Sequence, residues 1–311
     1  MPSPVQASAI ITCMILVTGA TGFIGSALIQ NLIKNGYKVR ALLQPSRKSP
    51  NLPHGMPMEV AVSSMWDERG MLAALKGIQV IFHLASAEKE SVSADIESID
   101  GDCTSVLVEA ARQAGIQRLF FLSHIGADKN SFFPVFRAKA LAESFIQESG
   151  VPFTIYRTSV VFGPGDNFTT YYLSALRSSP GLFFMPGDGN VNLQPLWIED
   201  LINCLVMSLE ERGMPNAAQI IGGGEYFSFR EILKAIMTRV GIRRLLIPLA
   251  PSYMRTINLW IGQYKHDFPL SPFWLDYLAA DCTCALDSLP RLCGILPGRF
   301  LNNLNYLKGG F

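Results

Sequence analysis

The sequence predicts a doubly wound parallel α/β sheet with a smaller C-terminal α/β lobe. In the first half of the chain, short apolar and β-branched runs alternate with stretches of helical periodicity. Parallel strands need helical crossovers of this kind, because the end of one strand and the start of the next lie at opposite edges of the sheet. The runs VIFHLA (80–85) and RLFFLS (118–123) are almost continuously apolar, which is typical of strands buried on both faces.

The elements of the first half follow one another along the chain. Strands are expected at residues 14–18, 38–43, 58–62, 79–84, 117–123 and 152–157. Helices are expected near residues 23–35, 68–76, 102–114 and 135–148. We therefore assign residues 14–160 to one doubly wound domain. We expect residues 1–13 to be a disordered extension or, alternatively, the result of a misassigned start, with Met14 as the true first residue.

The pattern loosens after residue 160, where Gly and Pro become frequent. A helix is expected at 198–211, and AAQII (217–221) predicts a strand. Ser228 then precedes a helical stretch as its N-cap, and Glu231 completes a capping box. We assign residues 161–311 to a C-terminal lobe for a substrate or partner, partly interleaved with the first domain.

Composition limits the classes of function. Charged residues make up 16% of the chain and the formal net charge is +1, so no long-range positive field favours nucleic acid. Mean hydropathy is +0.25, yet no window has the roughly 18 to 20 uninterrupted apolar residues of a transmembrane segment. Residues 243–262 come nearest, but arginines and prolines interrupt them. We expect them to line an apolar pocket or to touch a membrane surface or a partner.

The cysteines and histidines indicate neither metal binding nor export. Six cysteines and four histidines are scattered without metal-ligand spacing, so no metal site is expected. The N-terminus lacks the basic start and apolar core of a signal peptide. We therefore expect reduced, mostly buried cysteines and a cytoplasmic location.

Three glycines follow the first strand. Gly19, Gly22 and Gly25 form G-x-x-G-x-x-G between strand 14–18 and helix 23–35. Glycine permits the tight turn, lets the backbone approach a pyrophosphate and brings helix and strand close together. The amides at the helix N-terminus then face the anion. The strand, turn and helix together predict a nucleotide-binding turn.

Six segments extend this motif across most of the chain. VTGATGFIGSALIQNLIKNGYKVRALLQ (17–44) contains the three glycines. It is followed by VIFHLAS (80–86), RLFFLSHIGAD (118–128), RAKALAE (137–143), YRTSVVFGPGDNF (156–168) and QPLWIEDL (194–201). Together they resemble the extended and atypical short-chain dehydrogenase/reductases, which include epimerase/dehydratase-like proteins. The resemblance is greatest to the atypical branch: NmrA-like proteins, isoflavone-reductase-like enzymes and the nucleotide-binding accessory subunit of respiratory complex I.

This resemblance implies that residues 14–160 form an NAD(P)-binding Rossmann domain. The positions expected to contact the cofactor are Gly19, Thr21, Gly22, Phe23, Ile24, Gly25, Gln44, Arg47, Ser64, Leu84, Ala85, Ser86, Lys139, Thr158, Ser159 and Val161. Ser64 lies in the pair Ser63–Ser64, where relatives often place an aspartate that contacts the adenine. A serine hydroxyl replaces one of those hydrogen bonds.

NADP(H) is expected in preference to NAD(H). The second strand ends in RALLQPSRK (40–48), and no acidic residue follows before Glu59 to accept a ribose 2′-hydroxyl. Gln44 occupies the position that the resemblance associates with this choice, and Arg47 and Lys48 follow within reach of a 2′-phosphate. Solvated loop charges are the alternative interpretation of these two cations.

The resemblance also implies a catalytic set that is incomplete in this chain. In the family, a tyrosine and a lysine four residues later lie on one helix face, and a serine at an earlier strand end orients the substrate carbonyl. Lys139 matches the lysine and Ser123 the serine, whereas Val135 stands at the tyrosine position. His124 is an alternative acid, although strand alternation directs it away from the face of Ser123.

Other polar residues near the expected nicotinamide end match no acid position of the family. They are Tyr156, Asp128 and Asp166.

Two functions of different classes follow. Lys139 alone can serve an enone- or quinone-like substrate, because hydride transfer to an activated carbon needs less acid assistance than carbonyl reduction. The protein is then an NADP(H)-dependent reductase of a small apolar substrate. The alternative is a non-catalytic nucleotide-binding subunit, assembly factor or redox sensor. A sugar-nucleotide epimerase is disfavoured, because those relatives also use the tyrosine.

Overall fold

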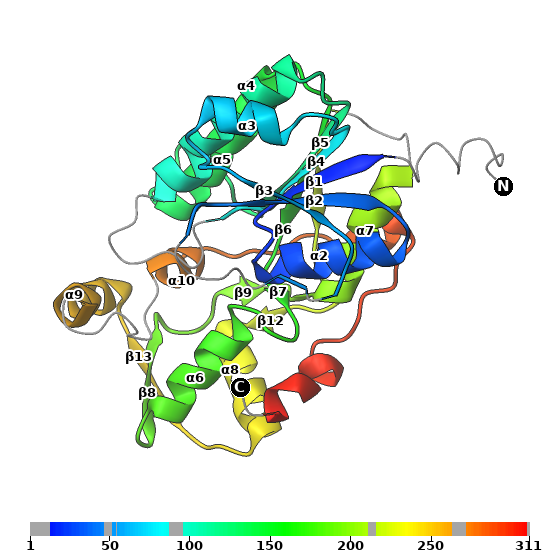
Figure 1. The fold of residues 1–311 in the computed structure, drawn as a ribbon. Coiled ribbons are helices and arrows are strands. Elements are labelled where there is room, and N and C mark those ends of the chain that lie inside the picture. The colour runs from blue at the N-terminus through cyan, green and yellow to red at the C-terminus, as the bar shows by residue number, and fades with distance from the viewer. Residues whose placement is uncertain are drawn as a thin grey trace.

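The main sheet of the protein is parallel throughout. The structure, a computed structural model, describes residues 13–46, 52–53, 55–86, 96–210, 216–262 and 272–309. Among these residues, seven strands pair in the order β11-β6-β5-β4-β1-β2-β3, with all neighbours parallel (Figure 1). The strands are β1 (Met14–Thr18), β2 (Lys38–Leu43), β3 (Glu59–Val62), β4 (Val80–His83), β5 (Arg118–His124), β6 (Phe153–Thr158) and β11 (Ala217–Ile221). The predicted doubly wound sheet is confirmed.

Helices cover both faces of this sheet (Figure 1). One layer contains α3 (Glu68–Ala74), α4 (Cys103–Gln113) and α5 (Pro134–Glu148), and the other contains α2 (Phe23–Lys34) and α7 (Ile198–Glu210). Leu119 and Phe121 pack against the first layer, whereas Phe120 packs against the second, because successive strand residues point to opposite faces. Burying each such side chain is worth about 1.5–3 kcal/mol, so the apolar runs of the sequence stabilise both layers.

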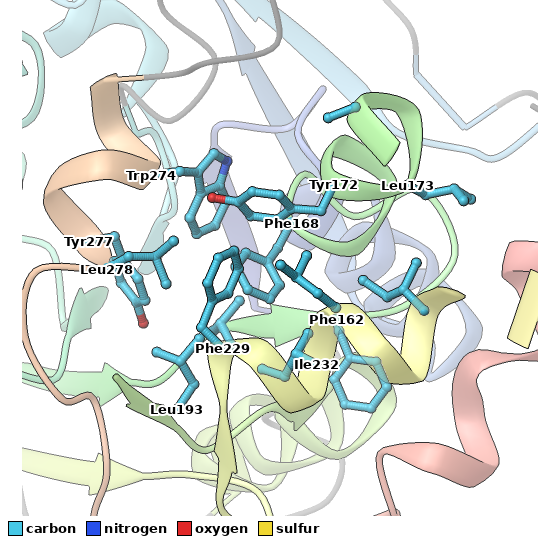
Figure 2. Close-up of a cluster of buried hydrophobic side chains, with 14 of the residues drawn as sticks. Phe162, Phe168, Tyr172, Leu173, Leu193, Phe229, Ile232, Trp274, Tyr277 and Leu278 are labelled. Atoms are coloured by element: carbon cyan, nitrogen blue, oxygen red, sulfur yellow. The ribbon is translucent and has the colours of Figure 1, made fainter. Parts of the chain in front are cut away.

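A second core lies beneath the carboxyl edge of the sheet. Its strands are β7 (Val161–Phe162) with β10 (Leu196–Trp197), β8 (Leu182–Pro186) with β13 (Leu245–Leu249), and β9 (Asn192–Leu193) with β12 (Phe227–Ser228). Its helices are α6 (Thr169–Ser178), α8 (Phe229–Val240) and α10 (Pro272–Tyr277), and α9 (Pro251–Gly262) contacts α10. Figure 2 shows Phe168, Tyr172, Phe229 and Trp274 converging in this core. The capping box of Ser228 is present as predicted.

The C-terminal tail connects the two cores. Leu289 of α11 (Ser288–Cys293) is buried against the α2–α7 layer. Leu304 and Leu307 of the 3-10 helix η3 (Leu301–Lys308) are buried in the second core. Two elements of the second half of the chain belong to the main sheet and its layers: β11 is an edge strand of the sheet, and α7 packs on one of its faces. The second half of the chain therefore contributes to both cores. No helix of the described residues has the length and apolarity needed to cross a membrane.

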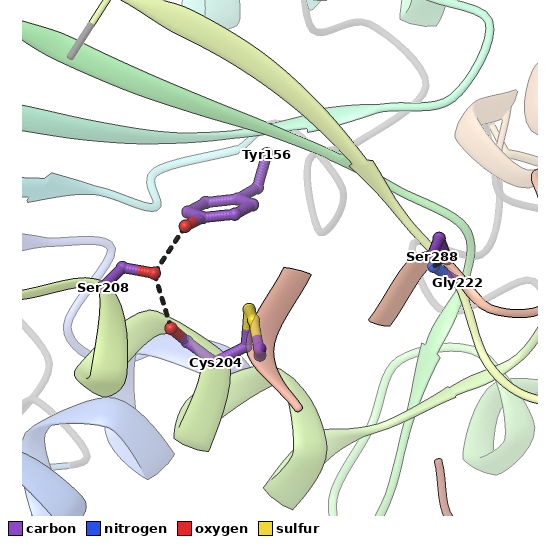
Figure 3. The surroundings of a disulfide bond; sticks show 6 residues. Tyr156, Cys204, Ser208, Gly222 and Ser288 are labelled. Atoms are coloured by element: carbon purple, nitrogen blue, oxygen red, sulfur yellow. Dashed lines mark hydrogen bonds between the residues drawn. A yellow bond between two sulfur atoms is a disulfide. The ribbon is translucent and has the colours of Figure 1, made fainter. Parts of the chain in front are cut away.

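A disulfide joins this tail to α7, the helix that packs on the sheet. The expectation that all six cysteines are reduced is therefore wrong. Cys204 of α7 is bonded to Cys293 of α11 across a sequence separation of 89 (Figure 3). Both are buried, and the packing of the tail on α7 brings them together. Disulfides persist mainly in oxidising compartments. The bond therefore removes the support that reduced cysteines gave to a cytoplasmic location.

We predict that the variant Cys204→Ala/Cys293→Ala unfolds at lower urea concentration than the wild type, because a disulfide of this loop length stabilises by about 2–5 kcal/mol. Dithiothreitol should lower the stability of the wild type and leave that of the double variant unchanged. As a control, iodoacetamide should label four of the six cysteines after unfolding without reductant. Labelling of all six would show that the bond does not form.

Candidate functional site

The turn after β1 rests on the backbone of the loop after β4. Gly19 has a φ of +66°, and a Cβ built there would lie 2.6 Å from the carbonyl carbon of Leu84 and 2.7 Å from the nitrogen of Ala85. A Cβ at Gly25 would lie 2.2 Å from the carbonyl oxygen of Gly19. Only glycine fits at both positions. Since β1 and β4 are neighbours at the point where the strand order reverses, this contact marks the ligand-binding crevice of a doubly wound sheet.

The N-terminus of α2 is suited to an anion. Gly22 is the N-cap, and no side chain of the described residues caps the helix there. The amides of Phe23, Ile24 and Gly25 are the first of the helix, and such amides have no partner within the helix itself. The helix dipole adds a partial positive charge at the same end. These features fit the pyrophosphate of a dinucleotide.

The other predicted contact positions are distributed along the same carboxyl edge. Gln44 follows β2 and is exposed, Ser64 follows β3, and Leu84 to Ser86 follow β4. Thr158 is the last residue of β6, Ser159 follows it, and both are buried. The Ser159 hydroxyl accepts a hydrogen bond from the amide of Gln194 at 3.0 Å.

Three predicted positions need separate mention. Thr21 is exposed within the glycine-rich turn, and Val161 is part of β7 and pairs with Leu196. Arg47 lies outside the described residues. The structure thus brings the described positions to one edge, as expected for parallel strands, while their roles in binding stay predictions.

A chain of buried polar groups starts beside the glycine-rich turn. The Thr18 hydroxyl lies 2.7 Å from Nδ1 of His83, and Nε2 of His83 lies 3.0 Å from the hydroxyl of Thr104. Thr104 donates to the carbonyl oxygen of Asp100 at 2.7 Å. Burial and the nearby Lys139 lower the pKa of His83 to about 3, so its imidazole is neutral at pH 7.

Lys139 lies at the far end of this chain. Its Nζ is 3.1 Å from Oδ2 of Asp100, and both side chains are 2% exposed. The same carboxylate oxygen accepts a hydrogen bond from Ser86 at 3.4 Å, and the ammonium lies 5.2 Å from the ring centre of Phe121. Asp100 precedes α4 on a π-helix of residues 97–102, and no sequence motif singled it out. Through Ser86 the ion pair reaches the loop that touches Gly19.

Ser123 belongs to a different polar group. Its hydroxyl donates to Oε1 of Glu143 on α5 at 2.5 Å, and Glu143 is paired with Arg157. Ser123 is fully buried and points toward α5. The predicted serine is therefore at the expected strand end, with its hydroxyl engaged by a carboxylate.

His124 has apolar, aromatic neighbours. Its ring contacts Phe273 and Tyr277 of α10 edge-on, at centroid distances of 5.7 Å and 5.2 Å. Both ring nitrogens are buried and have no hydrogen-bond partner among the described residues. Burial, with a smaller contribution from Lys139, holds the pKa of His124 well below its usual value. The imidazole is therefore neutral at pH 7, so one ring nitrogen is a donor and the other an acceptor.

Val135, at the tyrosine position, is part of the second core. It is 1% exposed and belongs to the same apolar cluster as Phe136 and Tyr277. This side of α5 is packed against α10, and the valine has a packing role there. A tyrosine would need space that its neighbours occupy.

The remaining polar candidates have structural partners. Tyr156 lies 2.5 Å from the hydroxyl of Ser208 on α7 (Figure 3). Asp166 is 1% exposed, accepts amide hydrogen bonds at the start of α6, and receives the hydroxyl of Tyr306 at 2.8 Å. Asp128 accepts the amide of Asn130 in an exposed turn. Each contact accounts for its residue without a substrate.

The parallel sheet, the glycine contact at the strand-order reversal and the α2 N-terminus, which no described side chain caps, are the features of a dinucleotide-binding protein of the Rossmann type. A comparison with protein families identifies the family. Residues 12–259 match the NmrA-like family, and the chain belongs to that family.

The proteins with similar sequences have several different roles. The chain is 27% identical to the mitochondrial NADH dehydrogenase [ubiquinone] 1 alpha subcomplex subunit 9 of Arabidopsis thaliana, over 94% of this chain and 78% of that protein. It is 26% identical to an NAD(P)H azoreductase of Xenophilus azovorans, over 90% and 93%. A photosystem II assembly factor, Ycf39 of Cyanophora paradoxa, is 31% identical, but the match spans only 46% of this chain and 44% of the assembly factor.

A solved structure confirms the fold. The dTDP-glucose 4,6-dehydratase DesIV of Streptomyces venezuelae, crystallised with NAD and TYD, superposes with a TM-score of 0.72. Its sequence is 19% identical, and the match covers 95% of each chain. The two chains therefore share the same fold.

We predict that Gly25→Ala weakens NADPH binding by at least about tenfold, equivalent to about 1.4 kcal/mol, because the new methyl group would lie 2.2 Å from the Gly19 oxygen. Fluorescence titration measures the affinity. Gly309→Ala is the matched control, since a Cβ there meets nothing closer than 3.7 Å. Unchanged affinity in Gly25→Ala would contradict the assignment of the glycine-rich turn.

We predict that Asp100→Asn lowers the unfolding free energy by about 3–5 kcal/mol, because it leaves the buried Lys139 ammonium without its counter-charge. The double variant Asp100→Leu/Lys139→Met removes both charges and should recover most of this loss. Urea titration compares the three proteins. Equal stability of Asp100→Asn and the wild type would show that the pair is not closed in solution.

Proposed function

We propose that the protein binds NADP(H) and reduces an apolar enone- or quinone-like substrate, using Lys139 without the usual tyrosine. The observation that carries the proposal is the position of Lys139. Its ammonium is held by Asp100, which also contacts Ser86 in the loop that touches the glycine-rich turn. A fixed positive charge is therefore maintained beside the predicted dinucleotide site.

The preference for NADP(H) rests on the end of β2. No carboxylate occurs between Arg40 and Glu59, so nothing in that stretch repels a 2′-phosphate. The Arg40 guanidinium is engaged by Glu59 and by the carbonyl oxygens of Ala74 and Lys76. Arg40 is therefore engaged elsewhere, and Arg47 and Lys48, which lie outside the described residues, are the cations that we propose for the 2′-phosphate.

The chain's own groups would prepare the substrate. Bound NADPH supplies a hydride. The Lys139 ammonium would hold hydroxyl groups of the dinucleotide and would stabilise the anion that forms when the substrate accepts the hydride, until a proton from water completes the reduced product. We propose that neutral His124 donates one hydrogen bond to a substrate oxygen; the absence of partners for its ring nitrogens among the described residues supports this role. The aromatic rings of α10 that surround it favour an apolar substrate.

A second candidate is a nucleotide-binding protein without turnover, acting as a subunit, assembly factor or redox sensor. Three observations favour it: Val135 is packed in the core, Ser123 is bonded to Glu143, and the charge of Lys139 is balanced by Asp100. Relatives named as a respiratory-complex subunit and as an assembly factor support the same possibility. Under either proposal, a cytoplasmic location remains an expectation from the sequence.

We predict saturable binding of NADPH, tighter than that of NADH, and steady NADPH oxidation with a panel of enones and quinones. Fluorescence titration and absorbance assays measure the two properties separately. The affinity of at least one nucleotide should be better than about 1 mM, which corresponds to about −4.1 kcal/mol. Failure of both nucleotides to bind would refute the proposal as a whole.

Two variants separate the candidates. Lys139→Arg keeps the positive charge opposite Asp100 and should slow turnover. His124→Phe removes two buried nitrogens that lack partners, so it should preserve or raise stability while lowering the rate. Binding without turnover in the wild type and in both variants would favour the non-catalytic protein.

A further inference from the structure

One face of the two-stranded sheet β8–β13 is apolar and exposed. In the parallel register, Leu182 pairs with Leu245, and Phe184 pairs with Ile247. Paired residues of a parallel sheet share a face, and residues two apart do as well. Leu182, Phe184 and Leu245 are 46%, 51% and 64% exposed, and Ile247 is half-buried. We call these four residues the β8–β13 face. The alternate residue Phe183 is buried in the second core, so the strands are amphipathic.

The helix that follows extends this surface. α9 begins two residues after β13, and its residue Tyr253 is 66% exposed. Figure 1 shows α9 and the β8–β13 pair at the margin of the molecule. Exposed apolar patches of this kind mark contacts with membranes or partners. None of the residues in this patch is among the positions predicted to contact the dinucleotide.

The two segments that contain β8, β13 and α9 carry charge of one sign, with Asp188 directly after the first segment and Glu231 directly before the second. No acidic residue occurs from residue 167 to residue 187 or from residue 232 to residue 262, the segments that contain both strands and α9. The cations within them are Arg177, Lys234, Arg239, Arg243, Arg244 and Arg255. Of these, Arg255 is paired with Asp276.

Arginines gather at one end of the β8–β13 face. Arg243 and Arg244 immediately precede β13, and Arg177 lies in the last turn of α6. The side chain of Arg244 donates to the carbonyl oxygen of Leu176 at 2.9 Å, which holds the end of α6 against the start of β13. Arg177 and Arg243 are both exposed. Leucine, phenylalanine and tyrosine side chains are thus bordered by positive charge.

We propose that the β8–β13 face and the first turn of α9 bind the surface of an anionic lipid bilayer. The apolar side chains enter the boundary between headgroups and acyl chains, and Arg177 and Arg243 attract anionic headgroups. Tyrosine at the rim suits this interface, because its ring is apolar and its hydroxyl stays hydrated. No described helix is able to span a bilayer, so the contact is peripheral. It does not depend on the proposed reductase activity.

A second copy of the chain is the less favoured occupant. Self-association would place Arg177, Arg243 and Arg244 of two copies close together, because a two-fold interface uses the same patch twice. The acid-free segments offer no counter-charge for such a dimer. An anionic lipid surface supplies that counter-charge.

The test is vesicle flotation of the full-length protein without nucleotide. Vesicles of phosphatidylcholine mixed with phosphatidylserine should carry the protein, and binding should weaken as salt is raised. Phe184→Ser/Leu245→Ser should bind at least about tenfold more weakly, because two exposed apolar anchors are lost. Arg243→Glu should bind at least about fivefold more weakly. Leu296→Ser is the matched control, since Leu296 is 85% exposed in the tail, and it should bind like the wild type.

Three results would overturn the proposal. The first is absence of flotation with the mixed vesicles, and the second is equal binding of Phe184→Ser/Leu245→Ser and the wild type. The third is a dimer, seen by sedimentation, that the double substitution dissociates while vesicles bind neither protein. Thermal melting and NADPH titration of each variant keep this test separate from the proposed function, because both should be unchanged when only the membrane surface is altered.

Discussion

The turn after β1 packs directly on the backbone of the loop after β4, and the absence of side chains at Gly19 and Gly25 makes this contact possible. The contact brings the start of α2 close to the strand-order reversal, so the uncapped amides of the helix lie at the carboxyl edge of the sheet. The predicted dinucleotide positions then gather there because parallel strands end on one side. A methyl group at Gly25 would separate helix and strand and disturb the whole edge.

Electrostatics beside that edge are balanced within the protein. A buried ammonium is costly unless it is paired and hydrogen-bonded, and Asp100 supplies the pairing for Lys139. The neutral His83 and the threonine hydroxyls on either side connect Asp100 to the end of β1 without adding charge. The lysine is therefore held in place before any ligand arrives. This fixed arrangement suits stabilisation of charge, whereas Val135 provides no proton.

The sequence predicted the fold closely because its signals are local. Apolar runs located the strands to within one residue in most cases, and the capping box located the start of α8. Strand alternation predicts different surroundings for Ser123 and His124, and the two side chains do contact different partners. The partner of Ser123 was not predictable from the local sequence, because Glu143 lies twenty residues further along the chain. Asp100 and the disulfide partners were missed for the same reason, since no local pattern connects residues that only tertiary packing brings together.

The C-terminal tail is attached to both cores. It is bonded to α7 by Cys293, donates an amide of Gly298 to Asp200, and then inserts Leu304 and Leu307 into the second core. The tail is therefore fixed at both ends, by a covalent bond to α7 and by apolar packing in the second core. Reduction of the Cys204–Cys293 bond would leave the Gly298–Asp200 hydrogen bond and the packing of Leu289 to hold the tail on the sheet side.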